Sequence, residues 1–243
     1  MYRIAAFTGS LLAFLAVSTA HSSIDEFVMV TGAKAPYSQS DASGFLDRLA
    51  GEAFLRLGHS VKVTSLPPPR ALRNASAGVA YGDMQRIKGL DKTVSGLVPV
   101  PEAISSYAFT GFTLKPLVKE IHLKDLKSMK VGYLRGWKFY ELNIPNDTFA
   151  IVAERPEQLF ALLKLERIDI ALFSRWSGFY WAKQVKLIVH AANPPFETIE
   201  MYMYLNIKNK ELAPKLARSL KSMKRDGTYD RIHAETLQRN AGS

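Results

Sequence analysis

The sequence of 243 residues contains no cysteine. Disulfide bonds, thiol nucleophiles and thiolate metal sites are therefore excluded. The five histidines are dispersed and match neither H-x-x-H nor H-E-x-x-H, the common spacings of a histidine metal site. A G-x-S-x-G nucleophile motif is also absent, because GVAYG at 78–82 has no serine. We therefore expect a protein that is not an enzyme and that uses no cofactor and no metal ion.

Acidic residues are outnumbered, with 22 Asp and Glu against 32 Lys and Arg, and the formal net charge is +10. Basic proteins often bind nucleic acid or membranes. Here the basic residues occur singly or in pairs, and even KSMKR at 221–225 is typical of a solvated helix surface. We expect no nucleic-acid partner. Dispersed positive charge favours either a small anionic ligand or solubility alone.

An uncharged apolar run, IAAFTGSLLAFLAV, follows Arg3 at residues 4–17. It is shorter than the roughly 20 residues that span a bilayer. Small residues, Ser18 and Ala20, precede His21 in the pattern of a signal-peptidase site. We therefore expect residues 1–20 to be a secretory signal peptide and the mature protein to be periplasmic.

Strand and helix patterns alternate along the rest of the chain. The first unit has strands at 26–33 and 59–66 and helices at 45–58 and 70–78. A second unit follows an extended segment at 106–118. It has a helix end and a strand within 126–136, strands at 168–174 and 186–191, and helices at 137–144, 154–167 and 175–185. A strand at 199–209 and helices at 211–225 and 226–238 end the chain. This alternation predicts an α/β protein whose parallel strands are covered by helices.

Residues 132–137 read GYLRGW and lie where a strand gives way to a helix. Backbone N–H groups at a helix N-terminus suit an anion. The alternative is a tight strand-to-helix connection with no ligand.

Four segments together resemble family 3 of the bacterial extracellular solute-binding proteins, which deliver polar amino acids to ABC importers. They are SGFLDRLAGEAFLRLG, KVGYLRGW, PEQLFALLKLERIDIAL and YMYLNIKNKELAPKLARSLKSMKRDGTYDRI, which begin at residues 43, 130, 156 and 202. The resemblance spans residues 24–238 and rests on the order of the segments, since each motif alone is weak.

The resemblance implies a two-lobed periplasmic binding protein fold of type II with two crossing hinge strands. Lobe 1 would comprise residues 21–106 and 200–243, and lobe 2 residues 107–199. The implied function is capture of a small polar, carboxylate-bearing ligand for an ABC transporter permease, by a protein that we expect to be a monomer. The cleft would lie at the carboxyl ends of the strands.

For the ligand carboxylate, the family uses an Arg in a T-x-x-R motif, which is absent here. Arg86 is the best replacement, because a guanidinium can bind a carboxylate with two hydrogen bonds. The alternative is a surface pair between Asp83 and Arg86 at helical spacing. The family's G-T turn corresponds to Gly136 and Trp137, so the backbone N–H groups remain and the hydroxyl is lost, with Arg135 as a possible added charge.

For the ligand amino group, the family's acidic residue corresponds to Ser174, which is followed by Arg175. This departure favours an anionic or neutral ligand, unless Asp83 or Glu102 supplies the acid from elsewhere. The remaining candidates for ligand contact are Tyr37, in the loop after the first strand, and Arg70, at the start of a short helix. Two alternative functions stay open: a ligand-sensing or partner-binding periplasmic module, and an enzyme like the dehydratases that share this fold.

Overall fold

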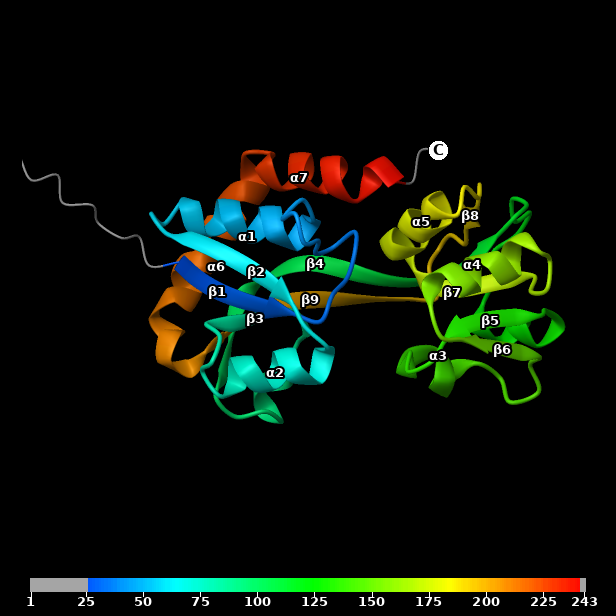
Figure 1. The fold of residues 1–243 in the computed structure, drawn as a ribbon, viewed down its shortest axis with the longest axis horizontal. Coiled ribbons are helices and arrows are strands. Elements are labelled where there is room, and N and C mark those ends of the chain that lie inside the picture. The colour runs from blue at the N-terminus through cyan, green and yellow to red at the C-terminus, as the bar shows by residue number, and fades with distance from the viewer. Residues whose placement is uncertain (1–25, 241–243) are drawn as a thin grey trace, which may run out of the picture.

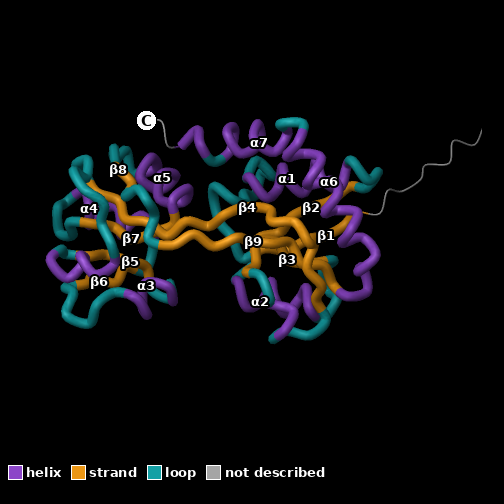
Figure 2. Tube along the Cα trace, turned by 180° about the vertical axis from the view of Figure 1, so that it is seen from behind, coloured by secondary structure: helices purple, strands orange, loops and turns teal. Residues whose placement is uncertain are grey.

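The computed structural model describes residues 26–240, which form two groups of elements joined by two long strands (Figure 1). These strands, β4 (Leu97–Thr113) and β9 (Glu197–Asn206), pair antiparallel from Leu97↔Asn206 to Phe109↔Glu197. From behind, both can be followed without interruption from one group to the other (Figure 2). The predicted signal peptide lies outside the described residues. Among residues 26–240, the helices are all too short or too polar to cross a bilayer.

The first group, called lobe 1 here, has three neighbouring strands: β1 (Glu26–Thr31), β2 (Ser60–Ser65) and β3 (Gly82–Ile87). Both β2 and β3 run parallel to β1. The helices of this lobe are α1 (Phe45–Leu55), α2 (Pro68–Ser76), α6 (Ala213–Arg225) and α7 (Thr228–Thr236), with 3-10 turns at Leu90–Lys92, Ile207–Leu212 and Gln238–Asn240.

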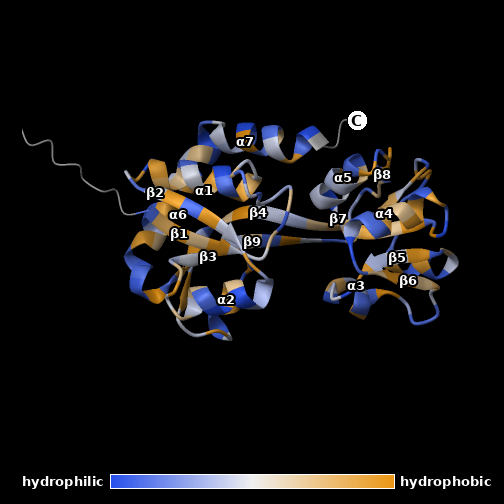
Figure 3. Ribbon diagram, viewed as in Figure 1, coloured by the Kyte–Doolittle hydropathy of each residue, from blue (hydrophilic) through white to orange (hydrophobic). Residues whose placement is uncertain are grey.

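Helices cover both faces of the lobe 1 sheet, and successive side chains of a strand point to opposite faces. Met29 packs into a core with α1 and α6, whereas the next residue, Val30, packs with Ala71 and Ala75 of α2. Helices α1 and α2 accordingly lie on opposite sides of the sheet (Figure 1). The helices carry hydrophobic and hydrophilic residues side by side, as expected for elements with one buried face (Figure 3).

The second group, called lobe 2, has strands β5 (Val131–Leu134), β6 (Ala150–Ala153), β7 (Ile170–Ser174) and β8 (His190–Ala191). Its helices are α3 (Lys138–Asn143), α4 (Pro156–Lys164) and α5 (Arg175–Gln184), and a 3-10 turn spans Leu123–Ser128. Strand β5 runs parallel to β6 and β7. The hydrogen-bonded order through both lobes is β2-β1-β3-β9-β4-β7-β5-β6, with β8 beside β4.

Strand β3 contains a bulge between Asp83 and Arg86, where its pairing with β9 shifts register. Gln85 lies in the bulge with a φ of 62°. On a regular strand, side chains three residues apart point to opposite faces. The bulge removes that alternation, and it allows Asp83 and Arg86 to form an ion pair.

A third connection between the lobes lies beside the hinge strands, where α7 approaches α5 (Figure 1). The ring centroids of Trp176 and His233 are 5.1 Å apart, and Trp176 packs against the lobe 1 core. Lys183 Nζ donates a hydrogen bond to the Arg239 carbonyl at 3.5 Å. The α7 helix and the backbone at Arg239 therefore contact lobe 2 on the side of α5.

Candidate functional site

A cavity of about 460 Å³ lies between the lobes. Its residues from lobe 1 and the hinge are Gly32, Ala33, Lys34, Ala35, Tyr37, Gln85 and Tyr107. Those from lobe 2 are Leu134, Trp137, Arg155, Pro156, Glu157, Phe173, Ser177 and Trp181. A volume of this size is typical of a pocket for a small molecule.

The strand ends explain why these residues meet. Strands β1, β5, β6 and β7 end at Thr31, Leu134, Ala153 and Ser174, and each cavity segment of 32–37, 134–137, 155–157 and 173–181 lies at or directly after one of these ends. Open α/β sheets place their ligands at the carboxyl ends of the strands. Helices α4 and α5 also begin here, with N-cap residues Arg155 and Ser174, so that two helix N-termini contribute partial positive charge.

Aromatic rings form much of the cavity wall and contact one another across the lobe boundary. Tyr37 stacks on Tyr107 with centroids 5.8 Å apart, and Tyr107 lies 6.3 Å from Trp137. Trp137 in turn packs against Phe173 at 4.4 Å. Such a wall offers flat apolar surface that favours a ring or another planar group.

Two buried hydroxyls near this wall have no hydrogen-bond partner among the described residues. They are the hydroxyl of Tyr37, a residue that is 2% exposed, and the hydroxyl of Ser174, which is 0% exposed. Burial raises the pKa of Tyr107 to about 12, and the nearby Ser174 hydroxyl partly opposes this shift. Burial also raises the pKa of Tyr37. Both phenols are therefore neutral, and of the two residues with an unpaired hydroxyl only Tyr37 lines the cavity.

Three charged side chains lie at the exposed rim of the cavity: Lys34, Arg155 and Glu157. Within residues 26–240, no hydrogen bond or ion pair engages the side chain of any of them. Lys34 belongs to lobe 1 and Arg155 to lobe 2, so the two cations lie on opposite sides of the cavity.

Of the residues predicted from the sequence, Tyr37 and Trp137 line the cavity. Arg86 does not line it. Its Nε donates to Asp83 Oδ2 at 2.7 Å, and its Nη2 donates to the Pro68 carbonyl at 2.9 Å. Asp83 is 0% exposed, and burial raises its pKa to about 6 even though Arg86 opposes the shift. The Asp83–Arg86 ion pair is thus present, but its two residues lie on a bulged strand and not on the helix that their spacing suggested.

The turn at Gly136 is hydrogen-bonded to α3, the helix that follows it. Gly136 N donates to Glu141 Oε1 at 2.7 Å, and Arg135 Nε donates to Glu154 Oε1 at the same distance. Both groups that the sequence suggested for an anion therefore already have carboxylate partners, and neither residue lines the cavity.

The other predicted residues are also not among those that line the cavity. Arg70 is exposed on the first turn of α2, and the Arg175 guanidinium lies over the rings of Trp176 and Phe179 at 5.8 and 5.7 Å. Ser174 is buried at the N-cap of α5. Glu102, the other acid considered, pairs with Lys224 at 2.6 Å.

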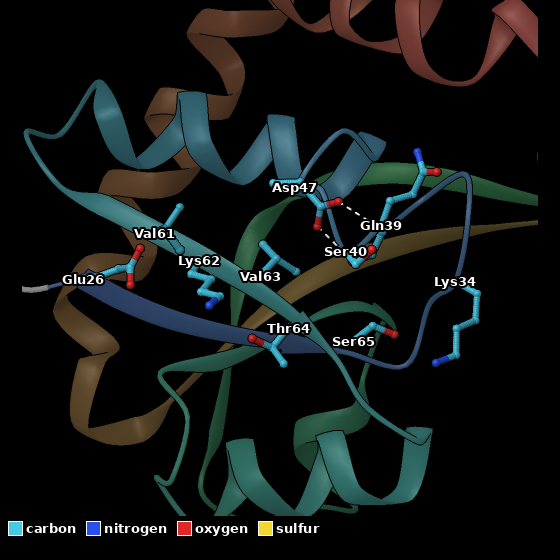
Figure 4. Close-up of a pocket in the computed structure, with 12 residues that line it drawn as sticks. Glu26, Lys34, Gln39, Ser40, Asp47, Val61, Lys62, Val63, Thr64 and Ser65 are labelled. Atoms are coloured by element: carbon cyan, nitrogen blue, oxygen red, sulfur yellow. Dashed lines mark hydrogen bonds between the residues drawn. The ribbon is translucent and has the colours of Figure 1, made fainter.

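A larger cavity, of about 710 Å³, lies beside strand β2 within lobe 1 (Figure 4). Its one buried carboxylate, Asp47, already accepts hydrogen bonds from Ser38 Oγ at 2.9 Å, Gln39 N at 2.8 Å and Gly44 N at 3.1 Å. This cavity has residues from a single lobe, and Asp47 serves to fix the loop at 38–44. The cavity between the lobes is therefore the better candidate for ligand binding.

No protein-family profile matches the sequence. A protein of Shewanella oneidensis strain MR-1, described as uncharacterized, is 29% identical over 187 residues, which cover 74% of this chain and 70% of that protein.

Solved structures are similar over most of the chain. An ancestral cationic amino acid solute binding protein, AncCDT-1, is 20% identical with a TM-score of 0.73, and the match covers 87% of this chain and 95% of that chain. The second substrate binding domain of a putative amino acid ABC transporter from Streptococcus pneumoniae is 16% identical with a TM-score of 0.69, covering 87% and 99%. The GluR0 ligand binding core in complex with L-glutamate is 11% identical with a TM-score of 0.71, covering 88% and 99%.

Similarity at these identities establishes the fold. The α/β class and the two-lobed architecture predicted from the sequence are confirmed, and the chain has the type II periplasmic binding protein fold.

Proposed function

We propose that this protein is a periplasmic solute-binding protein of family 3, which captures a small carboxylate-bearing molecule and presents it to an ABC transporter permease. The observation that carries this proposal is the cavity of about 460 Å³ whose walls come from both lobes. AncCDT-1 and the Streptococcus pneumoniae domain, which are described as solute- and substrate-binding proteins, support the same role.

Binding would couple to closure of the lobes about β4 and β9. A ligand that contacts Tyr37 on lobe 1 and Trp137 on lobe 2 stabilises the closed arrangement over the open one. In this proposal lobe 1 comprises residues 21–106 and 200–243 and lobe 2 residues 107–199, and the described part of each lobe moves as one body. Residues 1–20 direct export, and the protein acts as a monomer.

Two other functions use the same cavity. A sensor or partner-binding module would need the same ligand contacts without a permease, and the fold is shared with the GluR0 ligand binding core. An enzyme would need a general acid or base at the ligand. Glu157 is the one carboxylate among the described residues that line the cavity, and no histidine lines it. This lining favours binding over catalysis, although AncCDT-1 is described as a precursor of cyclohexadienyl dehydratase.

A thermal-shift screen of the purified protein tests the proposal. The panel holds amino acids, dicarboxylates, aromatic acids and small sugars. A ligand at 100 times its Kd stabilises the folded state by about 2.7 kcal/mol. A shift that disappears on mutation of a cavity residue supports solute capture, whereas no shift with any compound argues for the partner-binding alternative.

A further inference from the structure

Charged and neutral residues are separated within the cavity between the lobes. The three charged residues that line it, Lys34, Arg155 and Glu157, are all exposed. Every other lining residue is buried or half-buried, and the polar side chains among them are neutral: Tyr37, Gln85, Tyr107 and Ser177. The cavity therefore has an uncharged, aromatic interior and a charged rim.

Among the described residues, the interior offers no charged side chain to the charged end of a ligand, and the N-terminus of α5 offers it only partial positive charge. An ammonium or a carboxylate removed from water without a partner of opposite charge is strongly disfavoured. A flat apolar group would pack beside Tyr107 and Trp137, which line the interior. A hydroxyl or carbonyl at its far end would lie toward Tyr37, whose hydroxyl has no partner among the described residues.

The rim provides the partners for a carboxylate. Lys34 and Arg155 make no ion pair with another described residue, whereas Arg86 and Arg135 are held by Asp83 and Glu154. Arg155 also precedes the first turn of α4, where the helix N-terminus adds partial positive charge. A carboxylate between Lys34 and Arg155 would contact both lobes.

We propose, building on the solute-binding function above, that the ligand is an aromatic or similarly flat monocarboxylate. Its ring lies inward beside Tyr107 and Trp137, and its carboxylate lies outward between Lys34 and Arg155. An α-amino group is not required. An ammonium beside the carboxylate would lie at the same rim, where Glu157 is the one carboxylate among the described lining residues, against the two cations that hold the carboxylate.

The test measures Kd by isothermal titration calorimetry for the purified exported protein. The probes are 3-(4-hydroxyphenyl)propionate, 3-phenylpropionate, L-tyrosine, L-glutamate and L-arginine. We expect 3-(4-hydroxyphenyl)propionate to bind at least tenfold more tightly than L-glutamate and L-arginine. It should also bind more tightly than 3-phenylpropionate, and its Kd should lie within tenfold of that of L-tyrosine.

Two charge-matched variants locate the carboxylate. Arg155→Gln is expected to weaken binding of 3-(4-hydroxyphenyl)propionate at least tenfold. Arg135→Gln, which removes an exposed arginine already paired with Glu154, is expected to change it less than twofold. Circular dichroism and the unfolding midpoint check that both variants fold, and Lys34→Gln gives an independent measure from lobe 1.

The outcomes separate this inference from the proposed function. Tight binding of glutamate or arginine, unaffected by Arg155→Gln, would leave a solute-binding protein but overturn the aromatic monocarboxylate. Equal losses in Arg155→Gln and Arg135→Gln would overturn the assigned position of the carboxylate. Absence of binding for all five probes would overturn the inference, and extension of that absence to the whole thermal-shift panel would contradict solute capture as well.

Discussion

Arg86 Nη2 lies 2.6 Å from Asp83 Oδ2, within a single bulged strand. The arginine expected to bind the carboxylate of a ligand thus binds a carboxylate of its own chain. The Asp83 carboxylate is 0% exposed, and its second oxygen has no hydrogen-bond partner among the described residues. The pair is therefore a structural feature of β3, and it gives predictions that differ from those of a ligand clamp.

We expect Arg86→Ala to reduce the free energy of unfolding by about 3 kcal/mol, because it leaves a buried carboxylate without its partner. Ligand affinity should change little. Urea unfolding and calorimetry measure the two effects. The double variant with Asp83→Asn is the control and should recover part of the stability. A stable Arg86→Ala protein that has lost its affinity would instead favour the clamp.

Stability should depend on pH through Asp83. Its pKa is raised from 3.8 to about 6 in the folded protein, so the folded state takes up a proton more readily than the unfolded chain. The stabilising contribution of the protonated form is fully present below pH 3.8 and is lost as pH rises through about 6. Over this pH range the contribution of Asp83 to the free energy of unfolding falls by about 3 kcal/mol, because each unit of pKa shift corresponds to about 1.36 kcal/mol.

Asp83→Asn removes this titration. The difference in unfolding free energy between Asp83→Asn and the unmodified protein should therefore change between pH 4 and pH 6.5. A constant difference over this range would show that Asp83 keeps an ordinary pKa.

The contact between α7 and α5 should limit motion of the lobes. Trp176→Ala removes the ring that packs 5.1 Å from His233, and we expect faster hydrogen exchange in α5 and in the turn Gln238–Asn240. Hydrogen-exchange mass spectrometry without ligand measures this effect. Trp181→Phe, on the same helix but lining the cavity, is the matched control. Unchanged exchange in Trp176→Ala would mean that the hinge strands alone set the arrangement of the lobes.

Gly178 is expected to be intolerant of alanine. A Cβ atom at this position would lie 2.1 Å from the buried Phe112 ring, so either α5 or that ring would have to move. We expect Gly178→Ala to cost about 1–3 kcal/mol of stability, as overpacked cores do. Gly51→Ala in α1 is the matched control, because nothing lies within 4 Å of its Cβ. That variant should gain up to about 1 kcal/mol, and similar values for the two variants would contradict this packing.

Sequence patterns predicted the elements with strong periodicity and missed short or irregular ones. The helices α1, α4 and α6 were found because each has a regular apolar face. Strand β6 has only four residues, and β3 carries Asp83 and Gln85 in a bulge, so that neither shows simple alternation. The apolar run at 186–191 was predicted as a strand, yet only His190–Ala191 pair, and Ile188 is 69% exposed.

The lining of the cavity was predictable from the sequence only in part, for the same reason. Tyr37 and Trp137, two of the predicted residues, line it because they follow strands that the sequence reveals. Arg155 and Glu157 also line it but were not predicted, because they follow β6, which the sequence did not reveal. The position of a motif in the sequence also does not reveal its hydrogen-bond partners. Only the structure shows that Gly136 N donates a hydrogen bond to Glu141 Oε1.

A crystal structure of the protein with a ligand found by the screen tests the account most directly. We predict that the ligand lies in the cavity between the lobes. It contacts Lys34 or Tyr37 on lobe 1, and it also contacts Trp137 or Arg155 on lobe 2. A ligand that contacts one lobe only, or that lies in the cavity beside β2, would contradict capture between the lobes.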